Sequence, residues 1–469
     1  MALALVVLSA LTIGAATTVP GFVRVAIAAP LTALALVVTV QDPRRSILFL
    51  LTWLAVFATV RRVLLGAGAA SNEDPLLLVA PVVVGLLLIV AVRQGAMRQR
   101  SRLTSAVLLL SGLIVAGALN PLQGSPAAGL AGLLFVLVPV LWFWIGRTLV
   151  DDDLLQRILR LVGMFAIGAA AYGLFQVYRG FPPWDALWIE TKGYNSLRVG
   201  DALRQFASFS SAAEYVGFMA IGVIIWVLRV RRSPGAIIGF AVLSLLGWAL
   251  AVASVRGVLL SLPVALGMVF AASRGFGVAR TVVFGLAGLV ALGFLVSFID
   301  PATVGGDRTE ALLNRQVTGI SDPFNPKVST LPVHIDLVIG GFEQALRNPV
   351  GRGLGTVTVA GARYGTETAI TETDPSNMAV ALGLPGFLAY GAVVVLGMTL
   401  ALRRARASRD FLSLAALGIL LVTSFQWLNG GAYAVAPLPW LVLGWLDRPD
   451  GDRAVGDIQA ADASELAVN

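Results

Sequence analysis

The chain has 469 residues, of which 57% are hydrophobic and only 13% are charged. Because soluble domains carry roughly 25% charged residues, this composition excludes an ordinary soluble protein and indicates a membrane protein. The net charge of +8 does not predict nucleic-acid binding, because the basic residues lie in short segments between apolar runs, where membrane proteins place them.

Apolar runs of about 17 residues or more recur along the whole chain, and each is long enough to cross a bilayer as a helix. We therefore predict an all-α polytopic membrane protein with about 12 to 14 transmembrane helices. The first run begins at Ala2 without a basic segment before it, so we interpret it as a membrane helix and not as a removed signal peptide. The expected spans are 2–19, 22–40, 46–60, 76–92, 103–119, 127–146, 156–178, 212–229, 235–254, 257–273, 281–299, 376–402, 411–428 and 431–446.

Arginine clusters follow the even-numbered spans. Arg44 follows the second span, Arg93 the fourth and Arg403 the twelfth. Because basic residues accumulate in cytoplasmic loops, this pattern predicts that both termini are cytoplasmic. Arg61 and Arg62 follow an odd-numbered span and oppose the pattern, but the other clusters outnumber them.

Two connections between spans are much longer than the others, and the orientation places both outside the cell. Long loops in compact proteins are usually functional or disordered, and the aromatic and apolar residues in these two favour order. The predicted segments are N-terminal transmembrane helices (1–178), a first extracytoplasmic loop (179–211), central transmembrane helices (212–299), a large extracytoplasmic loop (300–375), C-terminal transmembrane helices (376–446) and a disordered cytoplasmic tail (447–469).

Several charges lie close to the ends of spans. Arg256 stands in "AVASVRGVLLSL" between two spans, either as an interfacial arginine or as a cation at the floor of an external cavity. In the first loop, Arg198, Arg204 and Glu214 flank a run of small and hydroxyl residues. That segment is either a solvated loop or a phosphate site, since arginine matches phosphate oxygens bidentately.

The large loop contains the segment "HIDLVIGGFEQALRNP", whose apolar residues recur at helical spacing. This pattern predicts an amphipathic surface helix that ends at Asn348 and Pro349. Gly351, Gly353 and Gly355 follow. Such a glycine series is either a tight turn or a weak indication of phosphate binding.

Three segments together resemble the O-antigen ligase and O-antigen polymerase superfamily. They are "LRNPVGRGLG" followed by "GLPGF", "ASVRGVLLSLPVAL", and "RQFASFSSAAEYVGFMA", and they cover roughly residues 195–400 in the family's order. The resemblance implies an integral-membrane glycosyltransferase of the bacterial plasma membrane, with a donor oligosaccharide carried on undecaprenyl diphosphate at the outer face. It implies no cofactor, neither a nucleotide sugar nor a metal. It also implies a glycan or lipid acceptor among membrane lipids, with a flippase and a chain-length regulator as further partners.

The chain departs from the ligase pattern at one position. Ligases of this family usually carry a His-Asn pair before the Gly-Leu-Pro-Gly turn, and the histidine is their expected base. Here the stretch reads "ETDPSNMAVALGLPG", in which Glu372, Asp374, Ser376 and Asn377 occupy the region. His334 falls instead where many members carry an arginine. In this respect the chain is more similar to polymerases of capsule and exopolysaccharide systems.

Glycosyl transfer from a lipid diphosphate requires cations for the leaving group and a base for the acceptor hydroxyl. The first candidate base is Asp374, followed by Glu372 and His334; Asp374 could alternatively cap the following helix. The candidate diphosphate-binding residues are Arg204, Arg256, Arg308, Arg315, Arg198 and Arg352.

Two other functions remain open. A polysaccharide transporter or a flippase for lipid-linked oligosaccharides should line its spans with charges and keep its loops short. The concentration of charges in two loops favours the enzyme. The missing histidine also leaves open an assembly subunit without activity. The sequence does not distinguish a polymerase from a ligase, nor does it define the sugar, the linkage or the acceptor.

Overall fold

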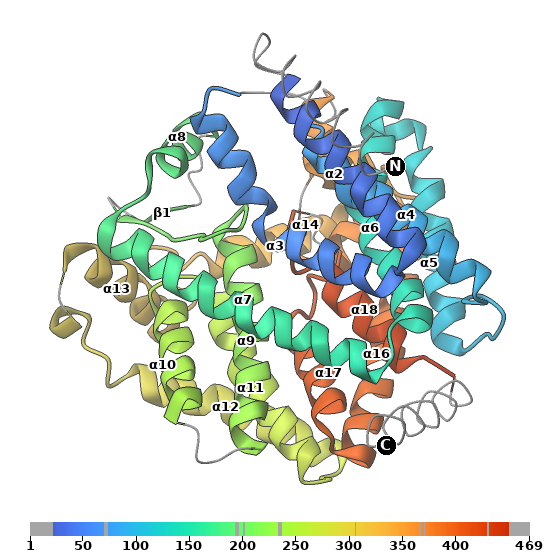
Figure 1. Cartoon of the computed structure of the whole chain (residues 1–469). Helices are drawn as coiled ribbons and strands as arrows, with labels where there is room; N and C mark the ends of the chain where they lie inside the picture. The colour runs from blue at the N-terminus through green and yellow to red at the C-terminus, as the bar shows by residue number, and fades with distance from the viewer. Residues whose placement is uncertain are drawn as a thin grey trace, which may run out of the picture.

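The computed structural model describes residues 22–69, 74–192, 197–199, 202–232, 237–304, 306–364, 367–369, 371–428 and 431–449. These ranges are mostly helical (Figure 1). Their strands are β1 (Arg198–Val199) and β2 (Ala202–Leu203), which form one short antiparallel hairpin. The prediction of an all-α polytopic membrane protein is confirmed.

Nine of the described helices are long and apolar enough to cross a membrane. They are α2 (Phe22–Gln41), α3 (Pro43–Gly66), α4 (Leu76–Arg93), α6 (Pro126–Leu149), α7 (Asp152–Arg179), α9 (Ala212–Arg232), α11 (Arg256–Ser273), α12 (Val278–Val296) and α16 (Asp374–Ser408). Four shorter apolar helices are α5 (Arg102–Ala118), α10 (Ile237–Ala251), α17 (Phe411–Val422) and α18 (Pro437–Leu446). A helix coincides with each expected span except 2–19, which lies outside the described residues.

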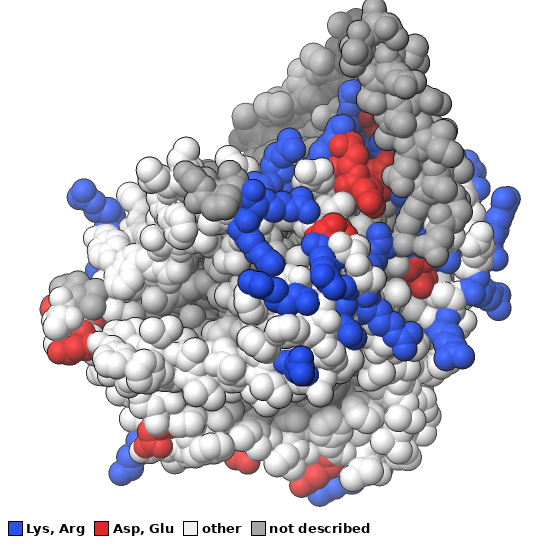
Figure 2. Space-filling model, turned by 90° about the horizontal axis from the view of Figure 1, so that it is seen from below, with Lys and Arg blue, Asp and Glu red and all other residues white. Residues whose placement is uncertain are grey.

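Side-chain contacts join the ends of α2, α4, α6, α9, α11, α16 and α18, with the connections that follow them, at one end of the bundle, which we call the basic face. Arg44, at the start of α3, forms an ion pair with Asp151, just before α7. Arg147, at the end of α6, donates to the carbonyl of Ala96 at 2.6 Å and pairs with Asp447 at 3.1 Å. Basic side chains gather together in the view from below (Figure 2).

The opposite end of the bundle, which we call the loop face, carries the remaining short elements. These are η1 (Pro121–Gln123), α8 (Pro183–Lys192), the β1–β2 hairpin, η3 (Pro301–Val304), α13 (Asp307–Ser321), α14 (Leu331–Arg347), η4 (Leu354–Val357) and α15 (Val359–Arg363). Successive spans therefore run in alternating directions between the two faces.

Arg62 holds several of these elements together. It is fully buried at the end of α3, and its Nε lies 2.6 Å from the buried carboxylate of Asp185 in α8. Its Nη atoms donate to the carbonyls of Phe209 and Ala207, each at 2.6 Å. Arg61 forms an ion pair of its own with Asp74. Both arginines that oppose the charge pattern are therefore engaged in structural ion pairs at the loop face.

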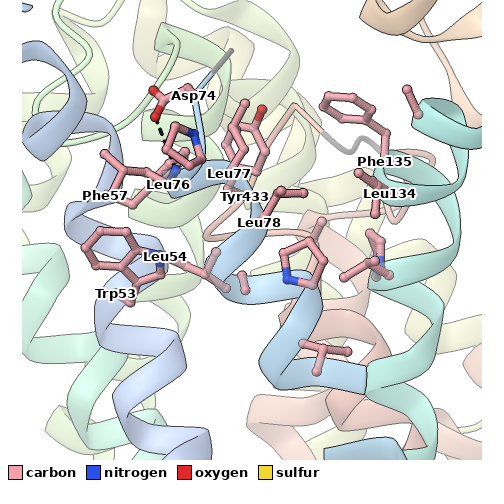
Figure 3. Close-up of a pocket in the computed structure, with 18 of the residues that line it drawn as sticks. Trp53, Leu54, Phe57, Asp74, Leu76, Leu77, Leu78, Leu134, Phe135 and Tyr433 are labelled. Carbon is pink, nitrogen blue, oxygen red and sulfur yellow. Dashed lines mark hydrogen bonds between the residues drawn. The ribbon is translucent and has the colours of Figure 1, made fainter. Parts of the chain in front are cut away.

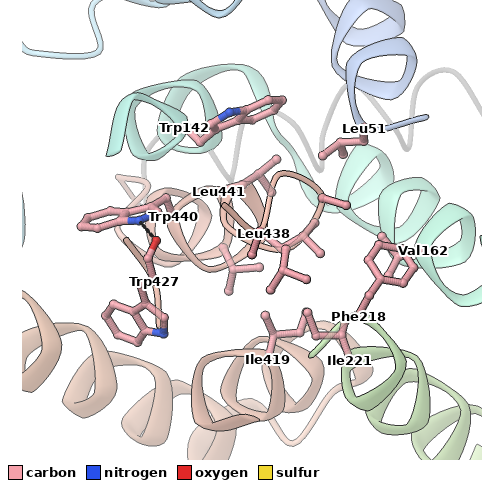
Figure 4. Packing of buried hydrophobic residues seen from close by; sticks show 14 of the residues in the cluster. Leu51, Trp142, Val162, Phe218, Ile221, Ile419, Trp427, Leu438, Trp440 and Leu441 are labelled. Atoms are coloured by element: carbon pink, nitrogen blue, oxygen red, sulfur yellow. Dashed lines mark hydrogen bonds between the residues drawn. The ribbon is translucent and has the colours of Figure 1, made fainter. Parts of the chain in front are cut away.

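The core lies where α18 packs against α6 and α17, and Phe218 and Ile221 of α9 join the same cluster (Figure 4). The indole Nε1 of Trp440 donates to the carbonyl of Trp427 at 2.8 Å, which satisfies a polar group inside the cluster. A Cβ on Gly146 would lie 2.8 Å from the carbonyl carbon of Leu441, and one on Gly444 would lie 2.9 Å from that of Phe143. Small residues thus allow α6 and α18 to meet backbone to backbone.

Helix α16 is broken at Gly383, whose φ of +70° lies in the left-handed region that favours glycine. The break frees carbonyl groups, and the segment 349–353 satisfies them. The backbone N–H of Arg352 donates to Val380 at 2.8 Å, and that of Gly353 donates to Ala381 at 2.9 Å. The large loop is therefore hydrogen-bonded into a membrane-spanning helix, rather than only connected to its end.

Candidate functional site

Three arginines from different elements converge at the loop face. Arg204 follows β2, Arg256 begins α11 and Arg315 lies on α13, and all three are partly buried. Burial, followed by the neighbouring charges of Arg315 and Arg256, lowers the pKa of Arg204 to about 10. The three guanidinium groups are therefore close enough to interact electrostatically, and we call them the arginine triad.

Arg256 is positioned by the chain that follows α13 and by α13 itself. Its Nη1 donates to the carbonyl of Val328 at 3.1 Å, and its Nη2 donates to the hydroxyl of Thr330 at 3.1 Å. Gly319 on α13 leaves room for the guanidinium, because a Cβ there would lie 2.6 Å from Cζ of Arg256. A glycine is thus required for this arginine to reach its present place.

The triad has no counter-charge among the described residues. The described arginines that form ion pairs with carboxylates all lie outside the triad. They are Arg24, Arg44, Arg45, Arg61, Arg62, Arg147, Arg157 and Arg352. In the described chain, the Nε atoms of Arg204 and Arg315, the hydroxyl of Ser254 and the amide group of Gln316 are buried without a hydrogen-bond partner. Buried unpaired donors next to uncompensated positive charge are suited to bind an anion.

A histidine and a carboxylate meet one helical turn from Thr330, which contacts Arg256. Nδ1 of His334 lies 3.2 Å from Oε2 of Glu372, and both side chains are nearly half exposed. His334 lies in the first turn of α14, where its N–H donates to the carbonyl of Thr330 at 3.1 Å. Thr330 also contacts Arg256. Thr330 and His334 are four residues apart, about 6 Å along the helix axis, so the His334–Glu372 pair lies about one helical turn from the residue that contacts Arg256.

Strained backbone accompanies these groups. Of the five non-glycine residues with positive φ in the described chain, three flank the site: Ala207 (+47°), Ser254 (+53°) and Glu372 (+53°). The left-handed region costs roughly 1–2 kcal/mol for such residues. Ala207 follows Arg204 by three positions, and Ser254 precedes Arg256 by two. Strain of this kind accumulates at functional sites, where the surrounding structure holds it.

Asp374 has a different environment from the other candidate bases. Its side chain is buried, and its carboxylate accepts hydrogen bonds from the hydroxyl of Tyr390 and the N–H of Leu428, both at 2.8 Å. Its own N–H donates to the carbonyl of Phe425 at 2.8 Å. The N-cap of α16 is Thr373. Asp374 thus joins the start of α16 to the chain after α17, which favours a structural role over catalysis.

The remaining candidate arginines lie outside the triad. Arg198 on β1 and Arg308 at the start of α13 are exposed. Arg352 is engaged, since its Nη1 donates to Gln344 at 3.1 Å and its Nη2 lies 2.9 Å from a carboxylate oxygen of Glu367. Of the pair Arg308 and Arg315, the structure brings only Arg315 to Arg204 and Arg256.

The glycine series of the large loop is explained by close packing. A Cβ on Gly351 would lie 2.6 Å from the backbone nitrogen of Gly383, and one on Gly353 would lie 2.8 Å from the side-chain oxygen of Gln123. Both glycines have positive φ. These contacts fit the tight turn and give no evidence of a phosphate-binding loop.

Sequence reasoning missed Thr330, which contacts Arg256, and two buried polar residues that lie close to the triad in sequence, Ser254 and Gln316. Ser254 lies within the segment quoted for Arg256, and Gln316 adjoins Arg315, so their positions gave a weak signal. Glu214, which was grouped with the first loop, is buried at the start of α9. It accepts hydrogen bonds from the N–H groups of Ser210 (2.9 Å) and Ala434 (2.7 Å) and holds two connections together.

The fold and the site define a multi-pass α-helical membrane protein with a cationic cluster at one face. In the described part of the chain, no group of three or more His, Asp or Glu side chains is placed to hold a metal ion. No protein-family model matches the chain. No curated protein matches it either.

Proposed function

We propose that this protein transfers a glycan from undecaprenyl diphosphate to an acceptor at the outer face of the bacterial plasma membrane. The reaction polymerises a surface polysaccharide, such as an O-antigen, a capsule or an exopolysaccharide, or ligates it to an acceptor. The observation that carries the proposal is an arginine triad without an ion pair among the described residues, whose Arg256 contacts Thr330, together with a histidine–carboxylate pair one helical turn from Thr330. The resemblance of three segments to the O-antigen ligase and polymerase superfamily supports it.

The triad suits the leaving group of this reaction. When the glycosidic bond to the lipid breaks, negative charge develops on the diphosphate. Arg204, Arg256 and Arg315 would stabilise that charge from three elements whose positions are fixed before the reaction, so little reorganisation is needed. Guanidinium groups suit this task because they bind two phosphate oxygens at once and remain charged at physiological pH.

The His334–Glu372 pair suits activation of the acceptor. Glu372 beside Nδ1 favours the tautomer in which Nε2 is the free acceptor. Nε2 would take the proton of the acceptor hydroxyl while the oxygen of that hydroxyl forms a bond to the anomeric carbon of the donor sugar. The bond from that carbon to the diphosphate oxygen breaks in the same step, and the lipid diphosphate leaves with the electron pair. His334 therefore becomes the preferred base, ahead of Asp374.

The orientation follows from charge. The basic face would be cytoplasmic, as the positive-inside rule requires, and the loop face with its triad would be external. A flippase for the same lipid-linked glycan would also use a cationic cluster, but it would not need a base. Loss of function in a base variant with normal lipid binding therefore distinguishes the enzyme from the transporter.

The test uses purified variants in liposomes supplied with a lipid-linked repeat unit, with polymer formation as the readout. We expect His334→Ala to lose on the order of a hundredfold in rate, with Asp336→Ala in the same helix as the matched control. Asp374→Asn should keep its activity per folded molecule, because an amide oxygen can still accept both hydrogen bonds. Arg256→Lys should remain impaired, because lysine lacks the guanidinium fork.

Normal rates in both His334→Ala and Arg256→Ala would remove the proposed site. A dead Asp374→Asn variant with an unchanged melting temperature would return the role of base to Asp374.

A further inference from the structure

A cavity of about 630 Å³ lies among α2, α3, α4, α6, α15 and α18. Trp53, Phe57, Leu134 and Phe135 surround it, with Tyr433 at one side (Figure 3). Neither the triad nor the His334–Glu372 pair lines it. Its volume lies within the range of small-molecule sites, and its lining is mostly apolar.

Prolines shape this cavity. Pro81 lies inside α4 and Pro139 inside α6, and both line the cavity. A proline inside a helix removes one backbone N–H and bends the helix. Pro75 before α4 and Pro437 at the start of α18 also line it. The space between these helices therefore results from the course of their backbones, and not from one small side chain.

The cavity opens toward the membrane. Among its lining residues, Val25 on α2, Leu78 on α4 and Leu134 on α6 are each more than 40% exposed, although all lie on membrane-spanning helices. Surface exposed on such helices faces hydrocarbon in a bilayer. A chain of the surrounding lipid can therefore enter between α4 and α6 without passing through water.

The end of the cavity at the loop face carries charge. Arg61, Asp74 and Arg363 line it, and Arg24 joins this group through an ion pair with Asp74. Among the described residues, this group contains three arginines and one carboxylate. Positive charge above an apolar cavity complements a ligand with an anionic head and a hydrocarbon tail.

We propose that this cavity binds a phosphorylated membrane lipid, with one hydrocarbon chain between α4 and α6 and the phosphate near Arg61 and Arg363. This lipid is distinct from the one whose diphosphate would meet the triad. The inference does not depend on glycosyl transfer, because its test measures binding alone. Phospholipids and polyprenyl phosphates share this chemistry, and the test separates the two.

The test places the full-length protein in nanodiscs with a photoactivatable lipid and maps the labelled residues by mass spectrometry. Three probes carry a diazirine in one hydrocarbon chain: phosphatidylglycerol, undecaprenyl phosphate and the neutral lipid diacylglycerol. We expect labels on 76–84 and 131–142 from at least one phosphorylated probe, and at least tenfold fewer from diacylglycerol. The phosphorylated probe that labels these residues more strongly shows whether the bound lipid is a phospholipid or a polyprenyl phosphate.

Matched variants test the cavity and its charged end. Ala131→Trp fills the cavity and should reduce labelling at least tenfold, whereas Leu130→Trp on the exposed side of α6 should not. Arg363→Gln should weaken labelling by the phosphorylated probe, whereas Arg347→Gln, an exposed arginine of α14, should not. If Ala131→Trp fails to fold, Leu134→Trp replaces it.

Labelling of α12, in which few residues are buried, at the same level as the cavity would overturn the proposal. So would equal labelling by diacylglycerol, or unchanged labelling in a folded variant with a filled cavity.

Discussion

Replacing Gly319 by alanine should impair the arginine triad without removing any charge. The added Cβ would lie 2.6 Å from Cζ and 2.9 Å from Cδ of Arg256, well inside the van der Waals separation of about 3.5–4.0 Å. The guanidinium is the flexible end of a long side chain, so it moves by about 1 Å or more before the backbone does. Its hydrogen bonds to Val328 and Thr330, both at 3.1 Å, are lost or lengthened.

The size of the effect follows from the interaction that is lost. A hydrogen bond to a charged group contributes roughly 1.5–3 kcal/mol. Losing one between Arg256 and a diphosphate should therefore weaken binding by about 10- to 150-fold. The protein should remain folded, because alanine inside a helix is more favourable than glycine by roughly 0.5–1 kcal/mol, which offsets part of the cost of the weakened hydrogen bonds of Arg256. The expected phenotype is a stable protein that binds its anion poorly.

The assay measures the dissociation constant of farnesyl diphosphate, a soluble probe of the site, together with the melting temperature in detergent. The matched control is Gly340→Ala in α14, where an added Cβ meets nothing within 4 Å. We expect normal affinity in the control and a similar melting temperature in both variants. A Gly319→Ala protein that binds within twofold of the parent would refute the assignment of Arg256 to an anion site.

Two further predictions concern buried charge. Arg62→Ala leaves the carboxylate of Asp185 buried without its partner, so it should destabilise the protein by about 3–5 kcal/mol. The control is Arg157→Ala, which removes the exposed ion pair with Asp153 and should change stability by less than about 1 kcal/mol. Equal melting temperatures of the two variants in detergent would contradict the structural role of the Arg62–Asp185 pair. Burial and neighbouring charge lower the pKa of Arg204 to about 10, and a bound anion favours its charged form. Affinity for farnesyl diphosphate should therefore weaken as pH rises through that value, and a titration of Arg204→Gln should lack this step.

The spans could be predicted from sequence because a membrane helix must satisfy its own backbone hydrogen bonds and must be apolar along its length. Even the short helices α17 and α18 follow from their apolar runs. The charge pattern could not explain why Arg61 and Arg62 lie at the loop face. The positive-inside rule counts arginines but does not consider whether each one is paired with a carboxylate. Asp185 lies 123 residues from Arg62, and no local pattern connects the two.

The site was only partly predictable for a similar reason. Residue type and motif identified Arg204 and Arg256, but Arg308 and Arg315 lie on the same helix, and only the packing of α13 against α11 separates them. The approach of His334 to Glu372 depends on how the start of α14 meets the chain before α16. Asp374 is turned inward by its contacts at that junction, which its position before a helix does not reveal.

The break in α16 has a consequence for biosynthesis. The segment 349–353 leaves the ribosome before α16, so the N–H groups that it donates to Val380 and Ala381 at first have no partner. Residues 374–382 alone are too short to cross a bilayer, and must insert together with the apolar residues that follow them. The break at Gly383 can then be completed only after insertion, when the earlier segment docks. Membrane insertion and completion of the fold are therefore separate events. Completion of the fold fixes the start of α16, and Glu372, which contacts His334, lies just before that start.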